Sequence, residues 1–205
     1  MTTETQSLVA RALHFAVTVD ALEIKADVAA LREAYPGLDN KALSKKILKR
    51  AAWTATGAGV LTGLPSNPFA AIPAAIADAG FVLRTEVKAA ARVALIYDPH
   101  FLDDEDACWE LLIPIFGIDA ASQALRELGM RGGMNLSRAV VRKYLSKATL
   151  KAFKSYMLKY FGLKVTQKAV ITKTVPVVGG LIGGTWNHIE VKLLGKRVIA
   201  YFEKP

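Results

Sequence analysis

Residues 69–97 read FAAIPAAIADAGFVLRTEVKAAARVALIY, and they decide how the rest of the chain must be arranged. Apolar side chains recur every three or four residues through this stretch, which places them on one face of a long helix. Pro73 lies near the expected start of the helix, where proline is tolerated, and Asp98-Pro99 ends it. The face that we expect to be buried consists of Ile72, Ile76, Ala79, Leu83, Val87, Ala91 and Ala94.

Helical periodicity also precedes this stretch. We expect one long N-terminal helix within residues 1–37, ended by Pro36-Gly37. Its apolar stripe would be Leu8, Ala12, Phe15, Val19, Leu22 and Ala26. A second helix is predicted to begin after Asp39 or Asn40 as N-cap and to continue until Pro65, before a turn at residues 65–68.

Further helices are expected after Pro99. The acidic group Asp103, Asp104, Glu105 and Asp106 opens the next one, because carboxylates complement the positive end of a helix dipole. A basic helical region would then end at Phe161, with Gly162 as its C-cap. The remaining predicted helical pieces are Trp109–Phe116, Ala120–Leu128, Val165–Lys173, Val175–Leu194 and Lys196–Phe202.

Composition supports a single folded unit. The chain has 205 residues, 52% of them hydrophobic and 22% charged, which suffices for one full core and excludes disorder as the main state. Strand signals are confined to short runs such as residues 170–178, which a proline interrupts. We therefore predict an all-α fold, a single-domain multi-helix bundle over residues 1–205 with glycine-rich, proline-broken apolar helices.

Two uncharged stretches bear on the membrane. Residues 51–77 contain three prolines, and residues 174–189 contain one proline and four glycines, whereas a simple spanning helix needs about 20 unbroken apolar residues. Each stretch is either a buried core helix or part of a hairpin that dips into a bilayer. The N-terminus lacks the basic start of a signal peptide. We expect a cytoplasmic protein that is peripheral to, or inserted in, the cytoplasmic membrane.

Charge is unevenly distributed along the chain, whose formal net charge is +9. Residues 1–127 hold 12 basic and 16 acidic side chains, whereas residues 128–189 hold 11 basic and no acidic ones. We call residues 128–189 the basic block. A basic surface of this kind attracts anionic lipid headgroups or nucleic-acid phosphates. Lysine outnumbers arginine in it by eight to three, which favours a diffuse field over base-specific contacts, so we rank lipid above nucleic acid.

Within the basic block, Lys147, Lys151 and Lys154 share one helical face. The opposite side carries Leu150, Phe153, Tyr156, Met157 and Tyr160. A core-packed helix with a solvated lysine face is one interpretation of this pattern. The functional interpretation is a contact with anionic lipid or phosphate, to which we also assign Arg138 and Arg142.

Glycine pairs at helical spacing predict close helix packing or shallow membrane insertion, because a bare backbone strip lets another helix approach. These glycines are Gly59, Gly63, Gly179, Gly180, Gly183 and Gly184. Tight packing within one domain and a glycine-mediated assembly in the membrane are the two alternatives, and a homo-oligomer is left open.

Two segments carry a family resemblance. Residues 56–98, TGAGVLTGLPSNPFAAIPAAIADAGFVLRTEVKAAARVALIYD, and residues 175–202, VPVVGGLIGGTWNHIEVKLLGKRVIAYF, resemble the EcsC family of bacterial proteins. The resemblance extends over about residues 38–202, is strongest at 51–98 and 175–202, and is weak at 118–165. It implies an α-helical, membrane-associated or lipid-facing protein. The family has no established catalytic residues, so the resemblance transfers none.

Candidate chemistry elsewhere is sparse. We interpret the acidic residues after His100, together with Glu110, as helix caps in preference to a cation site, because the calcium-loop pattern is absent. The single cysteine, Cys108, predicts a buried thiol and excludes a multi-cysteine metal site. His14 and His188 are expected to be structural. Asp78, Arg84 and Glu86 lie in a helix with a buried face and predict a buried polar site, in which a charge must be paired.

We therefore expect a non-enzymatic protein, without cofactor or metal, that associates with anionic membrane surfaces or lipids. Two alternatives stay open. One is a basic nucleic-acid-binding protein, and the other is a small-ligand or lipid carrier or enzyme with a pocket between helices.

Overall fold

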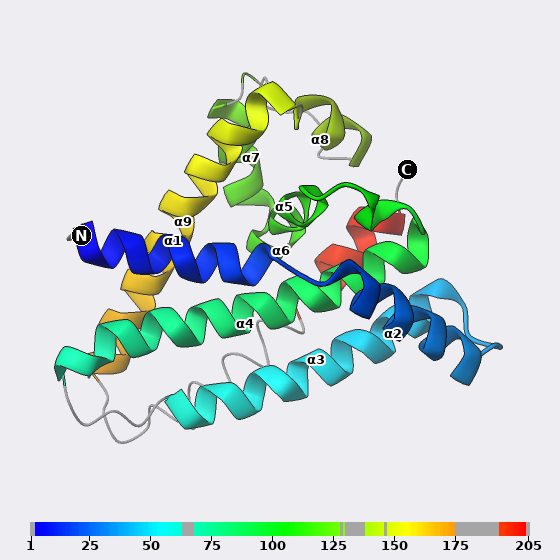
Figure 1. Ribbon diagram of the computed structural model, residues 1–205, viewed down its shortest axis with the longest axis horizontal. Helices are drawn as coiled ribbons and strands as arrows, with labels where there is room; N and C mark the ends of the chain where they lie inside the picture. Colours follow the sequence, from blue (N-terminus) through cyan, green and yellow to red (C-terminus); the bar gives the residue numbers. More distant parts are fainter. Residues whose placement is uncertain are drawn as a thin grey trace.

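A computed structural model describes residues 3–62, 68–127, 129, 138–145, 147–174 and 193–203. All regular elements in these ranges are helices, which confirms the predicted all-α class (Figure 1). None of the described helices is long and apolar enough to cross a bilayer.

Helix α4 (Pro68–Tyr97) is the centre of the arrangement, as the sequence predicts. It lies between α3 (Asn40–Thr62) and α1 (Thr3–Val17), and α9 (Lys147–Thr174) crosses both α1 and α4 (Figure 1). The expected face is buried at Ile76, Leu83, Val87, Ala91 and Ala94 and half-buried at Ala79, while the side chain of Ile72 lies outside the described part.

Small side chains set the distance between α4 and its neighbours. A Cβ atom added at Gly80 would lie only 3.0 Å from the Cβ of Ala12, so α1 contacts α4 almost backbone to backbone at this point. Fully buried alanines at 90, 91 and 94 continue the close packing along α4. This part of the core therefore depends on shape matching between short side chains more than on large apolar ones.

The N-terminal helix is two helices, so the prediction of one long helix is wrong. α1 ends at Val17, and α2 (Ala21–Ala34) begins after Asp20, whose Oδ1 accepts the backbone N–H groups of Leu22 at 2.9 Å and Glu23 at 3.1 Å. Because the chain turns here, the expected apolar stripe is broken: Phe15 is 49% exposed and Leu22 is 78% exposed. The buried residues are instead Val9, Leu13, Ala16, Val17, Ile24 and Val28.

After Asp98 the chain forms short helices, which split the predicted helix at 109–116 in two. They are η1 (Phe101–Asp103), α5 (Ala107–Glu110), α6 (Leu112–Phe116), α7 (Ile118–Glu127) and α8 (Arg138–Tyr144). In the acidic turn, Asp104 Oδ1 accepts the backbone N–H of Asp106 at 2.9 Å, while Asp106 at the N-cap of α5 accepts no side-chain cap bond. The described hydrogen bond of this acidic group therefore stabilises the turn before α5, and Asp106 does not cap the N–H groups of the first helical turn.

The basic region also differs from expectation. It contains two helices, α8 and α9, and α9 continues through Gly162 to Thr174, so the prediction that Gly162 is a C-cap is wrong. Gly162 is buried within the helix, and its carbonyl accepts the Thr166 hydroxyl at 2.8 Å. A final helix over residues 193–203 includes the predicted piece at 196–202.

The Asp20 cap supplies a stability test. Replacing Asp20 with Ala removes the acceptor of two N–H groups at the start of α2, which should lower the free energy of unfolding by about 1 kcal/mol. Urea denaturation followed by circular dichroism measures this difference. Glu33→Ala removes an exposed carboxylate from the same helix and should change stability by less than about 0.5 kcal/mol. Equal losses in both variants would contradict the capping role.

Candidate functional site

A cluster of charged and hydroxyl groups surrounds Glu110 of α5, and we call it the Glu110 cluster. Only 7% of Glu110 is exposed, yet its carboxylate accepts three hydrogen bonds. Oε1 accepts Arg138 Nε and the Tyr201 hydroxyl, both at 3.1 Å, and Oε2 accepts Arg142 Nε at 3.3 Å. The buried negative charge is thus compensated by two arginines of α8 and a tyrosine of the final helix, as burial of a charge requires.

Asp98, at the end of α4, completes the cluster. Its Oδ2 accepts Arg138 Nη2 at 2.7 Å and lies 3.9 Å from Arg142 Nη2. Burial alone would raise the pKa of the Asp98 carboxyl, but hydrogen bonds from Arg138 and from the His100 backbone N–H hold that pKa below its ordinary value. Two carboxylates therefore face two guanidinium groups, and the cluster is balanced in charge.

Aromatic rings position the inner arginine. The Arg138 guanidinium carbon lies 5.2 Å from the ring centre of Phe101 and 4.9 Å from that of Phe202, and the two rings meet edge to face. Burial opposes the charge of Arg138, but its bond to Asp98 and the charge of Glu110 raise its pKa overall. Burial and the same Glu110 charge raise the pKa of the Tyr201 hydroxyl, so it remains a donor.

Lys154 has an acidic partner as well. Its Nζ lies 2.6 Å from Asp106 Oδ1 and 5.1 Å from the ring centre of Trp109. Three of the five cations that the sequence assigns to an anionic partner are therefore engaged within the chain: Arg138, Arg142 and Lys154. Sequence alone does not reveal these pairs, because each joins residues from opposite sides of the boundary at residue 127.

Two other lysines of α9 face solvent. Lys151 is exposed, and so is Lys159, which is not among the cations predicted above to contact an anionic partner. Both belong to a stripe of exposed residues spaced by four, which we call the α9 stripe: Lys151, Ser155, Lys159 and Leu163. Neither lysine forms an ion pair with a described carboxylate. The sequence does contain a pattern that indicates Lys159: it follows Lys151 by eight residues, about two helical turns, in a helix without acidic residues. The side chain of Lys147 lies outside the described part.

The glycine predictions fall largely outside the described residues. Gly59 belongs to helix α3, whereas Gly63, Gly179, Gly180, Gly183 and Gly184, like His188, are not among the residues described. Close packing or insertion through these glycines stays a prediction.

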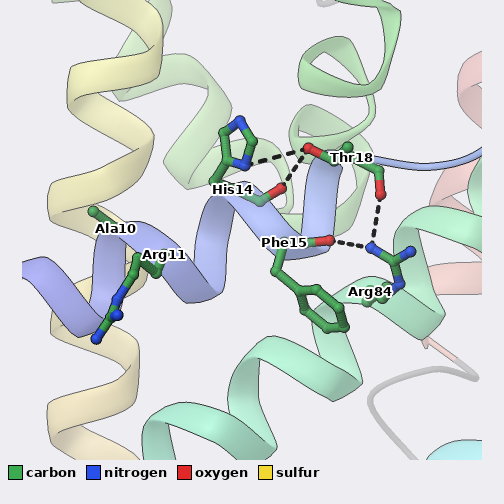
Figure 2. A pocket seen from close by; sticks show the side chains of 6 residues that line it. All are labelled: Ala10, Arg11, His14, Phe15, Thr18 and Arg84. Atoms are coloured by element: carbon green, nitrogen blue, oxygen red, sulfur yellow. Dashed lines mark hydrogen bonds between the residues drawn. The ribbon is translucent and has the colours of Figure 1, made fainter.

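The acids predicted to be buried in α4 are buried: Asp78 is 5% exposed and Glu86 is 7% exposed. Arg84, between them in sequence, turns to α1, where its Nη1 donates to the backbone carbonyls of Phe15 and, at 2.7 Å, Thr18 (Figure 2). Its guanidinium carbon also lies 4.2 Å from the ring centre of Phe15. Arg84 thus satisfies carbonyls at the C-terminus of α1, a position where a cation is favoured by the helix dipole.

A surface hollow of about 700 Å³ lies beside this contact, lined by Ala10, Arg11, His14, Phe15, Thr18 and Arg84. Figure 2 shows the Arg11 and His14 side chains extending in different directions, both away from Arg84. The hollow is open to solvent, and its polar groups do not converge on a point where a ligand atom could be held. Its main polar contacts are those that end α1.

Two of the described groups with reactive potential, Cys108 and Asp103, are buried or paired. Burial raises the pKa of the Cys108 thiol to about 12, and the side chain is 5% exposed, which agrees with the predicted buried thiol. Asp103 pairs with Lys25 at 2.7 Å and with His100 at 2.9 Å. Among the described residues, no three His, Cys, Asp or Glu side chains are grouped so that they could hold a metal ion.

Comparison with known proteins found no family model, no curated protein and no solved structure that matches the chain. The resemblance to the EcsC family therefore stays an expectation that rests on the residues quoted above.

Tyr201 tests the Glu110 cluster. Tyr201→Phe removes one donor from a buried carboxylate and should lower the free energy of unfolding by about 1–2 kcal/mol. Tyr35→Phe is the control, because Tyr35 is 38% exposed and loss of a hydroxyl at an exposed site should cost less than about 0.5 kcal/mol. Both values come from urea denaturation at pH 7. A Tyr35→Phe loss as large as that of Tyr201→Phe would refute the assignment.

The lowered pKa of Asp98 predicts an acid-dependent difference. A carboxyl whose pKa is lowered by folding stabilises the protein fully above its ordinary pKa of 3.8, and this contribution is lost as the pH falls through the folded-state pKa. Asp98→Asn should therefore be less stable than the wild type at pH 6, and the gap should narrow below pH 3.8. Urea denaturation of both proteins at pH 6 and below pH 3.8 measures the difference in their free energies of unfolding. A gap independent of pH would show that the charge of Asp98 is not the cause.

Proposed function

We propose that this is a non-enzymatic, EcsC-like helical protein that associates with anionic lipid surfaces through the α9 stripe. One observation carries the proposal: α9 has seven lysines and no acidic residue in 28 positions, and two of these lysines, Lys151 and Lys159, are exposed on one side of the helix.

The energetics suit a peripheral and reversible contact. A lysine or arginine close to an anionic leaflet contributes roughly 1 kcal/mol, and the attraction decays within a Debye length of about 10 Å at 0.1 M salt. Leu163, 57% exposed at the end of the stripe, adds an apolar side chain beside the two charges. A few such contacts give weak binding that salt reverses, in contrast to the anchoring provided by a spanning helix.

The structure also alters which cations belong to the proposal. Lys154 is held by Asp106 and the side chain of Lys147 lies outside the described part, so Lys151 and Lys159 are the lysines of α9 on which the proposal rests. Insertion of the glycine-rich segments is not needed for this mode of contact. The EcsC resemblance is consistent with it, since that family is expected to be lipid-facing.

Co-sedimentation with vesicles tests the proposal. At low salt the protein should pellet with vesicles containing phosphatidylserine and stay in solution with neutral phosphatidylcholine vesicles. Lys151→Glu with Lys159→Glu should weaken the anionic binding at least about tenfold, because it reverses two charges in the contact.

The control makes the same charge change elsewhere. Lys45 and Lys49 are exposed on α3, and Lys45→Glu with Lys49→Glu should reduce binding by less than about threefold. Equal recovery of the wild type with anionic and neutral vesicles would overturn the proposal. Equal loss in the two double variants would show that only net charge matters, and tighter binding to duplex DNA than to anionic vesicles at matched salt would favour the nucleic-acid alternative.

A further inference from the structure

The first described helix of the basic block, α8, is attached to the rest of the molecule by two valines and by the charged contacts of its two arginines. We propose that α8 is an autoinhibitory latch: Asp98 and Glu110 hold Arg138 and Arg142, and an anionic lipid surface bound at the α9 stripe competes for these arginines and releases α8. This inference rests on the proposed function, because it requires that surface to be present.

The attachments of α8 are of a kind that anions can displace. Among the described side chains of α8, Val141 is fully buried and Val140 is partly buried against the core, while the polar contacts come from the two arginines. Phosphate groups match the guanidinium geometry as well as carboxylates do, so a headgroup can take the place of either acid. An apolar attachment would not respond to the charge of a surface.

The two arginines differ in access. The Arg142 side chain is 53% exposed and its contacts with Glu110 and Asp98 measure 3.3 and 3.9 Å. The Arg138 side chain is 16% exposed and makes shorter contacts of 2.7 and 3.1 Å between two aromatic rings. Exchange would therefore begin at Arg142, which solvent and headgroups can reach, and Arg138 would follow when α8 moves.

Position connects the latch to the stripe. α8 ends at Tyr144 and α9 begins at Lys147, so the two helices are consecutive, and Lys151 lies in the second turn of α9 (Figure 1). Arg142 and Lys151 are nine residues apart in sequence, and the proposal requires that one surface reach both of them. The same geometry explains why the latch stays closed without an anion: release removes two of the three donors of a buried carboxylate and leaves Tyr201 alone.

Hydrogen exchange of the wild-type protein tests the latch. Amide exchange in α8 is compared without vesicles, with phosphatidylcholine vesicles and with phosphatidylserine vesicles, and sedimentation of the same samples reports binding. We expect α8 amides to exchange at least about tenfold faster with bound phosphatidylserine vesicles, while buried amides of α4 stay unchanged. Bound protein with unchanged or slower α8 exchange would overturn the latch and leave the proposed function intact. Protein that does not bind would overturn both.

A matched pair of variants separates the latch from net charge. Asp98→Asn removes a partner of Arg138, whereas Asp103→Asn removes a partner of Lys25, and both raise the net charge equally. Asp98→Asn should speed amide exchange in α8 in solution. It should also tighten vesicle binding about fivefold, which is the gain expected when one more cation becomes available to the anionic surface. Asp103→Asn should tighten binding less than about twofold. Equal tightening in the two variants would overturn the proposal.

Discussion

A buried carboxylate must be compensated, and the arrangement of the second half of the chain depends on how Glu110 meets this requirement. An ionised group at 7% exposure is costly unless cations and donors surround it. Arg138 and Arg142 bring α8 to α5, and Tyr201 brings the final helix, across sequence separations of 28, 32 and 91 residues. The edge-to-face rings of Phe101 and Phe202 then enclose Arg138. One side chain thus fixes the relative positions of three segments, namely α5, α8 and the final helix.

This interaction changes the meaning of the net charge of +9. Acidic residues of the segment 1–127 pair with cations of the basic block within the same chain. These pairs lie in the Glu110 cluster and between Lys154 and Asp106. Two other arginines donate hydrogen bonds to backbone carbonyls near the C-termini of helices. Arg32 donates to the carbonyl of Ile96 in α4 at 2.8 Å, and Arg197 donates to that of Ile115 in α6 at 2.7 Å. In the described part of the basic block, the exposed cations without an acidic partner among the described residues are lysines, which is why the α9 stripe carries the proposed function.

Sequence periodicity predicted what depends on local spacing. The buried face of α4 and the all-α class follow from apolar residues at intervals of three and four, and the buried thiol follows from the absence of an activating pattern around Cys108. The same periodicity failed at Asp20, because Val19 and Leu22 keep the helical interval across a break that only the Asp20 cap reveals. The prediction of a helix end at Gly162 failed because packing keeps α9 helical through a residue of low helix propensity. The ion pairs join distant residues, and no local pattern encodes them.

The burial of Cys108 has a consequence for the redox behaviour of the protein. Burial raises the pKa of the Cys108 thiol to about 12, so the thiol is protonated at neutral pH, whereas the thiolate is the form that oxidants and alkylating reagents attack. The chain has no other cysteine, so it cannot form an internal disulfide. Because Cys108 lies two residues from Glu110 in α5, any thiol that does react marks a molecule in which this neighbourhood has opened.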